Sequence, residues 1–348
     1  MRALANKLSK EDAQAKVALE PFGRKTLSFY RYIDIDSPAD LRDKLYVAWE
    51  KLGILGRIYL AEEGINAQIS VPIPKLEEFT EDLNSVAELN PVATPQPIRL
   101  NFALDQSAPS FWKLIIKIRS QVVADNLPKG SYDLKQVGEH LSPQEFNQAL
   151  ENGGVVVDMR NQYESVIGKF ANAITPHSQT FSEELREVAE LFKEKKSEPL
   201  LLYCTGGIRC EKASAFLLAQ GFTKVKQLEG GIINYAQAVK TTGLESKFHG
   251  KNFVFDARLA EAVTAEIIGK CYTCQTPADT YDNCKNDTCH NLIIQCDQCR
   301  VNTLGTCTLA CQKIVALPME EQIQIRKGHK ALFNRPVNRP VNRPVNFS

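Results

Sequence analysis

The sequence predicts a three-part α/β protein: a ferredoxin-like α+β domain, a central domain with a parallel sheet, and a small cysteine-rich C-terminal domain. Three observations predict it: the order of apolar runs in the first third, the alternation of strands and helices in the middle, and the crowding of eight of the ten cysteines between Cys271 and Cys311. We expect a polar leader at 1–23, the ferredoxin-like domain at 24–125, a linker at 126–140, the central domain at 141–242, the cysteine-rich domain at 243–320 and a basic, disordered tail at 321–348.

The elements of the first domain follow the order β-α-β-β-α-β. TLSFYRYIDI is rich in aromatic and β-branched residues and predicts a strand, whereas SPADLRDKLYVAWEKLG starts with a Ser-Pro cap signal and ends at a glycine, as a helix does. GRIYLAEEGINAQISVP predicts two strands around a turn, PKLEEFTEDLNSV a second helix, and FWKLIIKIRSQVV a last strand. This order is typical of the split βαβ, ferredoxin-like arrangement.

The turn in this domain is a candidate RNA contact. Its exposed candidates are Glu62, Glu63, Gly64 and Asn66. A sheet that also carries basic and aromatic residues would hold RNA by phosphate contacts and stacking, and the candidates are Arg57, Tyr59, Lys113 and Lys117. An ordinary hairpin turn, whose glycine takes a positive φ, explains the turn residues equally well.

The central domain alternates helices with buried strands. LSPQEFNQAL, EELREVAELFKEKK and EKASAFLLAQGF predict helices, and the apolar runs VVVDM, PLLLYC and KVKQL predict strands. Strands that alternate with helices in this way are typical of a parallel α/β domain.

The strand PLLLYC ends at Cys204, where ligands collect in an open parallel sheet. The loop that follows consists of Thr205, Gly206, Gly207 and Ile208. Its glycines let the backbone amides form a nest, and these amides together with the start of the next helix stabilise an anion. With Arg209, Cys210 and Lys212 nearby, we expect a lowered pKa and an exposed, ionised Cys204. The alternative is a buried structural cysteine at the end of a strand.

This loop resembles the active-site loop of the rhodanese family, in which the cysteine accepts sulfane sulfur as a persulfide. Cys204 and Arg209 stand at the matching positions, and LEGGIINY resembles the closing rhodanese motif, with Tyr235 where tryptophan is common. VVVDMRNQYESVIGKFANAI resembles the first rhodanese motif through Asp158, Arg160, Glu164 and Gly168. For the first three of these residues we favour a structural role, a turn cap and an ion pair, over a supporting role at the site.

A narrower resemblance covers nearly all of 25–311. Three segments, GRIYLAEEGINAQIS, CTGGIRCEKAS and GKNFVFDARL, together with the cysteine ladder, the eight cysteines from Cys271 to Cys311, resemble the rhodanese-like tRNA uridine-34 hydroxylases, formerly the UPF0176 proteins. The resemblance implies an oxidoreductase that converts the wobble uridine of certain tRNAs to 5-hydroxyuridine. It implies molecular oxygen as co-substrate, an electron donor, and the anticodon region of tRNA as the partner.

Sulfur is the reactive group that the residues offer for such a reaction. Five histidines are scattered without ligand spacing, and no flavin, haem, nicotinamide or 2-His-1-carboxylate iron signature is visible. Our hypothesis is that Cys204, as thiolate or persulfide, adds to C6 of the uracil and makes C5 electron-rich, while Arg209 and the loop amides stabilise charge. A sulfur donor or a reductant protein would then be a further partner.

Two other functions fit the same residues. The first is a persulfide-forming sulfurtransferase that takes sulfur from thiosulfate or a protein and passes it to a thiol, cyanide or a tRNA base. The second is a binding or regulatory module with a vestigial loop, which the intact Cys204 and Arg209 disfavour.

The cysteine ladder is a candidate metal-binding segment. It comprises Cys271, Cys274, Cys284, Cys289, Cys296, Cys299, Cys307 and Cys311. Two CxxC pairs and two further pairs supply eight thiolates, which suit two structural zinc sites in a domain with little core. His290 is an alternative ligand in one site. Reduced thiols or disulfides are the alternatives to zinc, and the spacing does not decide which pairs share a site.

The two ends of the chain add little. MRALANKLSKEDAQAK lacks the apolar core of a signal peptide, and no stretch approaches ~18 apolar residues, so we expect a cytoplasmic protein without membrane contact. The net charge of +1 indicates no general preference for nucleic acid. Near the other end, RPVN occurs three times over 335–346, and its prolines exclude a continuous helix. We favour a solubilising role for this basic tail over an RNA contact.

Overall fold

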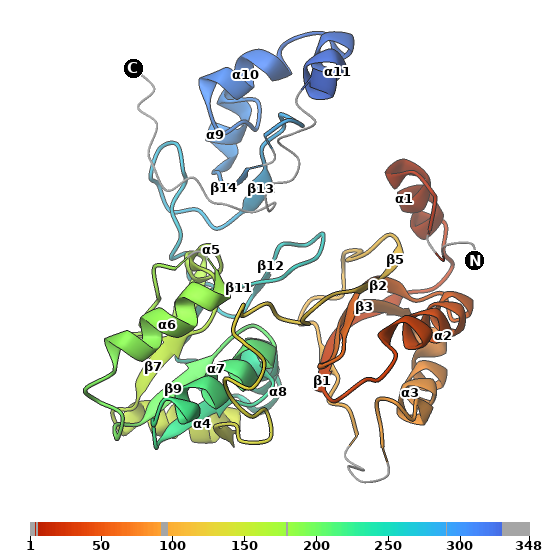
Figure 1. The fold of residues 1–348 in the computed structure, drawn as a ribbon. Coiled ribbons are helices and arrows are strands. Elements are labelled where there is room, and N and C mark those ends of the chain that lie inside the picture. The colour runs from red at the N-terminus through yellow and green to blue at the C-terminus, as the bar shows by residue number, and fades with distance from the viewer. Residues whose placement is uncertain (1–3, 5, 92–96, 179, 290, 329–348) are drawn as a thin grey trace. The chain divides into compact units, whose positions relative to one another are not determined.

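The computed structural model describes residues 4, 6–91, 97–178, 180–289 and 291–328. The RPVN repeats and His290 therefore lie outside the described residues. The chain forms two compact units (Figure 1). The first comprises 1–160, 172–245 and 254–258, and the second comprises 161–171, 246–253 and 259–348.

The first unit contains a five-stranded sheet in the order β4-β1-β3-β2-β5. The elements are β1 (Arg24–Tyr32), α2 (Pro38–Lys51), β2 (Leu55–Ala61), β3 (Gly64–Pro72), the 3-10 helix η1 (Ile73–Lys75), α3 (Leu76–Ser85), β4 (Asn101–Phe102) and β5 (Leu114–Ile118). The ferredoxin-like prediction is confirmed, with one difference. The strand beside β1 is the two-residue β4, whereas the predicted last strand becomes β5 and pairs in parallel with β2.

The sheet has one buried and one polar face because side chains alternate along each strand. Leu27 and Phe29 of β1 pack in a core with Trp49 of α2 and Phe79 of α3, whose rings meet edge to face at 5.5 Å. The helices α2 and α3 lie on this side of the sheet (Figure 1). The opposite face carries the alternate residues of β1, among them Tyr30, which contacts another part of the unit.

The predicted polar leader contains a helix, α1 (Lys10–Ala18). Ser9 caps it, since its hydroxyl accepts a hydrogen bond from the amide of Asp12 at 3.0 Å. Only Ala13 and Val17 are buried, so the sequence offers too narrow an apolar stripe to indicate the helix.

The same unit contains a four-stranded, wholly parallel sheet in the order β6-β10-β9-β7. Its elements are β6 (Glu139–Leu141), α4 (Pro143–Glu151), β7 (Val155–Asp158), α6 (Phe181–Leu191), β9 (Leu200–Tyr203), α7 (Ile208–Ala219), β10 (Val225–Leu228) and α8 (Gly231–Thr242). The predicted parallel α/β domain is confirmed. All four residues of β9 are buried, as expected for a strand covered on both faces.

The second unit combines a short segment of the central region with the cysteine-rich region. Its elements are α5 (Gln162–Ser165), β8 (Gly168–Phe170), β11 (Phe248–Phe253), β12 (Ala260–Ala262), β13 (Tyr281–Asn283), β14 (Leu292–Ile294), α9 (Asp297–Asn302), α10 (Leu309–Val315) and α11 (Met319–Gly328). The strand β8 pairs with β11, so residues near Gly168 join a sheet with residues far along the chain.

Helix α11 corrects the prediction that the tail is disordered from residue 321, because its described part is helical to Gly328. The acids Glu320 and Glu321 lie in the first turn and the bases Arg326 and Lys327 in the last, which suits the helix dipole. The prolines on which the prediction rested begin only after this helix.

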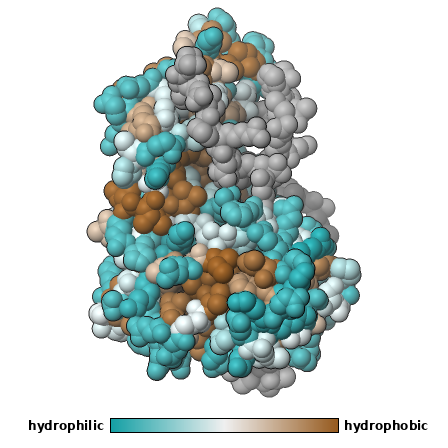
Figure 2. All heavy atoms as spheres, turned by 90° about the vertical axis from the view of Figure 1, so that its left-hand side faces the viewer, coloured by the Kyte–Doolittle hydropathy of each residue, from teal (hydrophilic) through white to brown (hydrophobic). Residues whose placement is uncertain are grey.

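The surface shows hydrophobic patches between larger hydrophilic areas on the face drawn in Figure 2. Leu191 and Val301 are among the exposed apolar side chains. Apolar surface of this kind is common on folded proteins and does not by itself define a binding site. Among the described helices, none has the length and apolar character needed to cross a membrane.

Candidate active site

Cys204 follows the last residue of β9, and helix α7 begins four residues later. Gly207 takes a φ of 99°, a conformation that favours glycine, and its N–H donates a hydrogen bond to the Cys204 sulfur at 3.1 Å. The amide of Ile232, near the start of α8, donates to the Cys204 carbonyl. One hydrogen bond thus spans the loop from Gly207 to the Cys204 sulfur, and the other holds the start of the loop to α8.

Cys204 is fully buried, which differs from the predicted exposed thiolate. Its side chain turns inward, toward the Gly207 amide and into an apolar cluster that includes Val157 and Cys210. The prediction of an exposed thiolate rested only on the loop and the next helix. Residues of the N-terminal sheet also contact this loop.

The pKa of Cys204 is lowered to about 6 despite this burial. Burial alone raises the pKa, but a hydrogen bond from the Cys210 thiol, the charge of Arg209 and backbone amides together outweigh it. The pKa of Cys210 is raised well above its usual value by burial and by the neighbouring Cys204. Of the two thiols, Cys204 is therefore the thiolate at neutral pH.

Arg209 lies at the start of α7, nearly buried, beside the same loop. Its guanidinium donates to the Thr205 hydroxyl at 3.3 Å and lies over the ring of Phe255 at 5.9 Å. The structure thus brings together the residues that the sequence singled out around Cys204.

The N-terminal sheet contributes three side chains to this loop. The amide of Asn101 donates to the Gly206 carbonyl at 3.4 Å, and the hydroxyl of Tyr32 donates to the Ile208 carbonyl at 3.2 Å. A Cβ placed on Gly207 would lie 2.8 Å from the Tyr30 hydroxyl oxygen, so glycine is needed there for two reasons, conformation and space. The candidate site therefore combines residues of both sheets.

Glu211 connects Tyr30 to the parallel sheet. Its carboxylate accepts hydrogen bonds from the Tyr30 hydroxyl at 2.8 Å and from Gln227 at 3.0 Å, and it contacts His140 at 2.9 Å. The hydrogen bond to Glu211 raises the pKa of His140. These contacts hold β1 against the first turn of α7.

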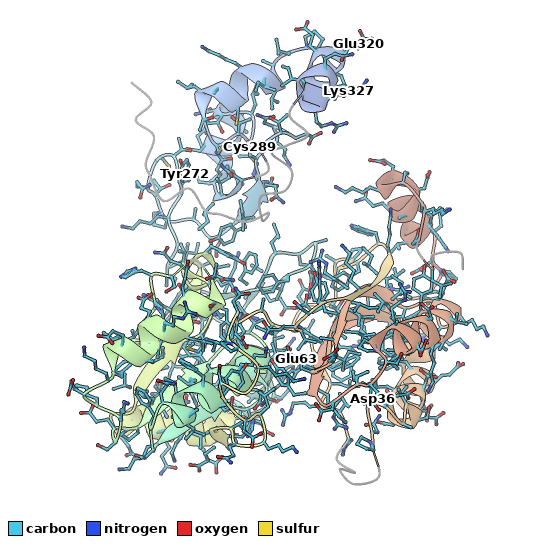
Figure 3. The ribbon with its side chains drawn as sticks, viewed as in Figure 1. Asp36, Glu63, Tyr272, Cys289, Glu320 and Lys327 are labelled. Atoms are coloured by element: carbon cyan, nitrogen blue, oxygen red, sulfur yellow. The ribbon has the colours of Figure 1, made fainter. Side chains whose placement is uncertain are left out.

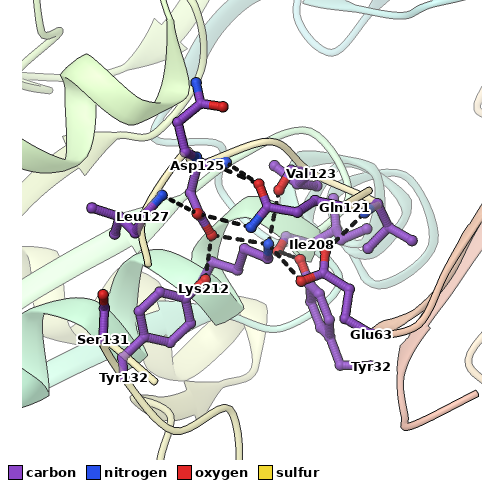
Figure 4. A network of polar contacts seen from close by, with 12 residues as sticks. Tyr32, Glu63, Gln121, Val123, Asp125, Leu127, Ser131, Tyr132, Ile208 and Lys212 are labelled. Atoms are coloured by element: carbon purple, nitrogen blue, oxygen red, sulfur yellow. Dashed lines mark hydrogen bonds and ion pairs between the residues drawn. The ribbon is translucent and has the colours of Figure 1, made fainter. Parts of the chain in front are cut away.

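Lys212 contacts carboxylates that the sequence did not suggest. Its ammonium is fully buried and pairs with Asp125 at 2.9 Å and Glu63 at 2.9 Å, and it donates to the Val123 carbonyl at 2.8 Å (Figure 4). The charge of Lys212 is thus paired with these two carboxylates, and none of these contacts involves the Cys204 sulfur. It ties α7 to the turn between β2 and β3 and to the segment after β5.

Glu63, predicted to be an exposed turn residue, is thus a structural contact. Its second carboxylate oxygen accepts from the amide of Val122 at 2.8 Å. The structure also agrees with the interpretation of EEGIN as an ordinary hairpin turn, because Gly64 has a positive φ and a Cβ there would lie 2.0 Å from the Arg31 carbonyl oxygen. Glu63, labelled in Figure 3, lies in the turn between β2 and β3.

Asp158 and Arg160 form a fully buried, two-pronged ion pair with distances of 2.7 and 2.8 Å. The hydroxyl of Tyr203, the residue before Cys204, donates to Asp158 at 2.6 Å. Glu164 lies in the second unit, where it completes a capping box with Asn161 at the start of α5. These contacts agree with the structural role that we favoured for the three residues, since none of the contacts involves the Cys204 sulfur.

Comparison with known proteins identifies the family. Residues 24–122 match the UPF0176 acylphosphatase like domain, 142–238 the Rhodanese-like domain, and 249–312 the Rhodanase C-terminal family. The tRNA uridine(34) hydroxylase of Leptospira interrogans serogroup Icterohaemorrhagiae is 49% identical over 94% of this chain and 88% of its own length. The chain belongs to the tRNA uridine(34) hydroxylase family. Family members from Enterobacter sp. and Photorhabdus laumondii are 44% and 43% identical, each over 96% of this chain and 96% and 95% of their own lengths.

In this tRNA uridine(34) hydroxylase family member the cysteine ladder folds into two groups of four. One comprises Cys271, Cys274, Cys296 and Cys299, and the other Cys284, Cys289, Cys307 and Cys311. The sulfur atoms in each group lie within 4.8 Å of one another, and none of the ten cysteines, all of which the structure describes, is in a disulfide. Zinc bound to four thiolates at about 2.3 Å places the sulfurs about 3.8 Å apart. Distances of 3.5 to 3.8 Å between sulfurs fit that geometry.

The pairing is interleaved: the first and third cysteine pairs along the chain share one group, and the second and fourth share the other. In the second group Tyr272 packs beside Cys289, both labelled in Figure 3. Four cysteines complete this group, so no histidine is needed as a ligand. Both groups fit structural zinc and leave no position open for substrate.

Several contacts of the family member's site were not predicted, namely those of Tyr30, Tyr32, Asn101 and Asp125. A signal for the tyrosines was present, because Ser28, Tyr30 and Tyr32 alternate with the buried Leu27 and Phe29 along β1. Aromatic residues on the polar face of a strand indicate a contact surface. Asn101 and Asp125 carried no such signal.

Proposed function

We propose that this protein hydroxylates uridine 34 of tRNA at C5, with Cys204 as the reacting residue. The observation that carries the proposal is the low pKa of the Cys204 thiol at the head of a rhodanese loop, in a chain whose relatives of similar length are named tRNA uridine(34) hydroxylases. We also propose a cytoplasmic location, because tRNA is used there.

In the proposed reaction the Cys204 thiolate forms a bond to C6 of the uracil, and the electron pair of the C5–C6 bond moves toward C5. Molecular oxygen oxidises C5, and loss of the C5 proton then expels the thiolate. Uridine, O2, two electrons and two protons give 5-hydroxyuridine and water. The reaction therefore requires a two-electron donor, for which a dithiol partner is a suitable class.

The protein's own residues support the entry and the departure of the sulfur. The Gly207 amide and the charge of Arg209 stabilise negative charge on Cys204, which makes it available as a thiolate and a good leaving group. Cys210, protonated beside it, donates a further hydrogen bond.

Burial of Cys204 adds a conformational step to this proposal. A uracil cannot reach a sulfur with no exposed surface, so the contacts of Tyr30 and Asn101 with the loop must open, or the sulfur must swing out, before C6 is attacked. The target base must also leave its stack in the anticodon loop.

The test is mass spectrometry of nucleosides from tRNA incubated with the protein, O2 and a dithiol. Cys204→Ser should lower the yield of 5-hydroxyuridine more than about a thousandfold, because a nucleophile is lost, and tRNA binding should persist. Cys210→Ser is the control, since it removes a loop thiol but keeps a hydrogen-bond donor, and it should retain measurable activity. Formation of the product by Cys204→Ser would overturn the proposed use of Cys204.

A second function, sulfur transfer, is favoured by the rhodanese-like match over 142–238. It predicts a Cys204 persulfide that discharges to an acceptor thiol, with no oxygen gained by uridine. The same incubation, with thiosulfate added and intact protein mass recorded, separates the two functions.

A further inference from the structure

We propose that the open half of the polar sheet face in the N-terminal region is a platform for single-stranded RNA, which leads the anticodon loop toward Cys204. The open half is defined by Asn66, Gln68, Arg57, Tyr59, Ile115 and Lys117. This inference rests on the proposed function, because it assigns a surface to the proposed substrate.

The strand register places these residues in two rows across one face. Asn66 stands opposite Tyr30 on one side and Tyr59 on the other, and Tyr59 stands opposite Lys117. In the next row, Gln68 stands opposite Ser28 and Arg57, and Arg57 stands opposite Ile115. The face is the one opposite α2 and α3, because Phe29 and the other intervening residues lie in the helix-covered core.

The first row begins at the candidate active site. The Tyr30 hydroxyl lies close to Gly207 and donates a hydrogen bond to Glu211. The second row starts with Ser28, which pairs with Asn101, and the Asn101 amide donates to the Gly206 carbonyl. Neighbouring strands lie about 4.8 Å apart, so Lys117 stands roughly 14 Å from Tyr30 along the row. A few nucleotides cover that distance.

The chemistry of the far half suits RNA. Arg57, Ile115 and Lys117 are exposed, and Tyr59 is half-buried with the Arg119 guanidinium over its ring at 5.4 Å. An aromatic ring beside Arg offers a stacking surface for a base, and the lysine and arginine charges meet phosphates. Asn66 and Gln68 add amide groups that both donate and accept hydrogen bonds. None of the six positions, all described by the structure, carries an acid.

Charge and shape select an RNA strand over other occupants. A protein partner would favour a larger apolar centre, whereas Ile115, 37% exposed, is the one aliphatic residue in the defined set. A double helix would need contacts over a longer distance than this half-sheet offers. Unstacked bases of an anticodon loop fit a flat face with one ring and separated charges.

The experiment measures binding of the full chain to the anticodon stem-loop of a tRNA that carries uridine 34, by fluorescence anisotropy at several salt concentrations. Tyr59→Ala should raise Kd about tenfold, because a stacking surface is lost. Lys117→Ala should reduce the salt slope of log K by about 1, because one phosphate contact is lost. In the tRNA reaction, Tyr59→Ala should raise KM more than it lowers kcat.

Two control variants keep the test specific. Lys51→Ala removes an exposed charge at the end of α2, on the helix-covered side, and should bind like the wild type. Tyr59→Phe keeps the ring and should also bind like the wild type. Unfolding curves of all four variants show whether weaker binding reflects lost structure.

The outcomes separate this inference from the proposed function. If the wild type hydroxylates uridine 34 but Tyr59→Ala and Lys117→Ala bind the stem-loop as tightly as Lys51→Ala does, the platform is wrong and the function stands. If the two variants weaken binding while the wild type forms no 5-hydroxyuridine, the platform stands and the proposed reaction falls. If the wild type does not bind the stem-loop, the platform is overturned.

Discussion

Cys204 and the eight cysteines of the second unit use the same side chain in two different ways. The Cys204 sulfur is supported by its own stretch of chain, since Gly207 donates to it and the thiol of Cys210 lies beside it. In the groups of four, each sulfur has other sulfurs as neighbours: the sulfurs of Cys289 and Cys307, for example, lie 3.5 Å apart although the two residues are 18 positions apart in the sequence. Contacts from a single loop leave the Cys204 thiolate reactive, whereas four sulfurs that face one another suit a metal ion that binds all four.

The largest expected effect concerns the groups of four. We expect the purified chain to carry two zinc ions and strong chelation to unfold 271–311, since structural zinc contributes on the order of 10 kcal/mol to folding of such segments. Metal analysis together with hydrogen exchange measures this. The ultraviolet thiolate absorbance of Cys204, taken as the difference from Cys204→Ser, should stay unchanged. A chain without metal whose exchange pattern ignores the chelator would contradict the prediction.

A smaller effect is expected for Lys212 of α7, which forms ion pairs with residues distant in the sequence. Lys212→Met leaves the buried carboxylate of Asp125 and the partly buried one of Glu63 without their cation, and should destabilise the first unit by about 3–5 kcal/mol in urea unfolding. Lys226→Met is the matched control, because its partly exposed pair with Glu139 contributes about 1 kcal/mol or less. Equal losses in the two variants would show that Lys212 is not the structural contact we describe.

The smallest effect concerns the charge at the loop. Because the folded pKa of Cys204 is depressed to about 6, its thiolate forms as the pH rises through that value, and its contribution to stability is lost as the pH falls through it. Arg209→Met removes the nearby charge and should move the midpoint of thiolate absorbance upward by about one unit. Arg209→Lys, which keeps the charge, should move it less. An unchanged midpoint in Arg209→Met would assign the low pKa to Cys210 and the amides alone.

The local parts of the molecule were predictable from the sequence. The alternation of apolar runs and helices indicated the parallel sheet, and PLLLYC followed by two glycines indicated the Cys204 loop, because each depends on periodicity or turn chemistry within a few residues. The lowered pKa of Cys204 was predicted from the same loop. The burial of Cys204 was not predicted, because residues of β1 and β4, more than one hundred positions away, contact its loop at Gly206 and Ile208.

Long-range pairing explains the other differences. The two-residue β4 is too short to show any period, and it pairs with β1, whereas the predicted last strand, β5, pairs with β2. Lys212 is one of several cationic residues close to Cys204 in the sequence. Its ion pairs with Asp125 and Glu63 arise only in the folded chain and could not be predicted from the sequence. The interleaved cysteine groups likewise depend on which turns meet, which spacing alone does not specify.

Burial of an ionised Cys204 also bears on how the protein survives oxidising conditions. Thiolates are the form that peroxides attack, and a residue that is both ionised and reachable is readily converted to sulfenic and then to irreversible acids. With no exposed surface, Cys204 is shielded from small oxidants until a conformational change exposes its sulfur. The arrangement thus restricts a highly reactive atom to the moments when its cover is open, and oxidative damage should be fastest while the protein is turning over.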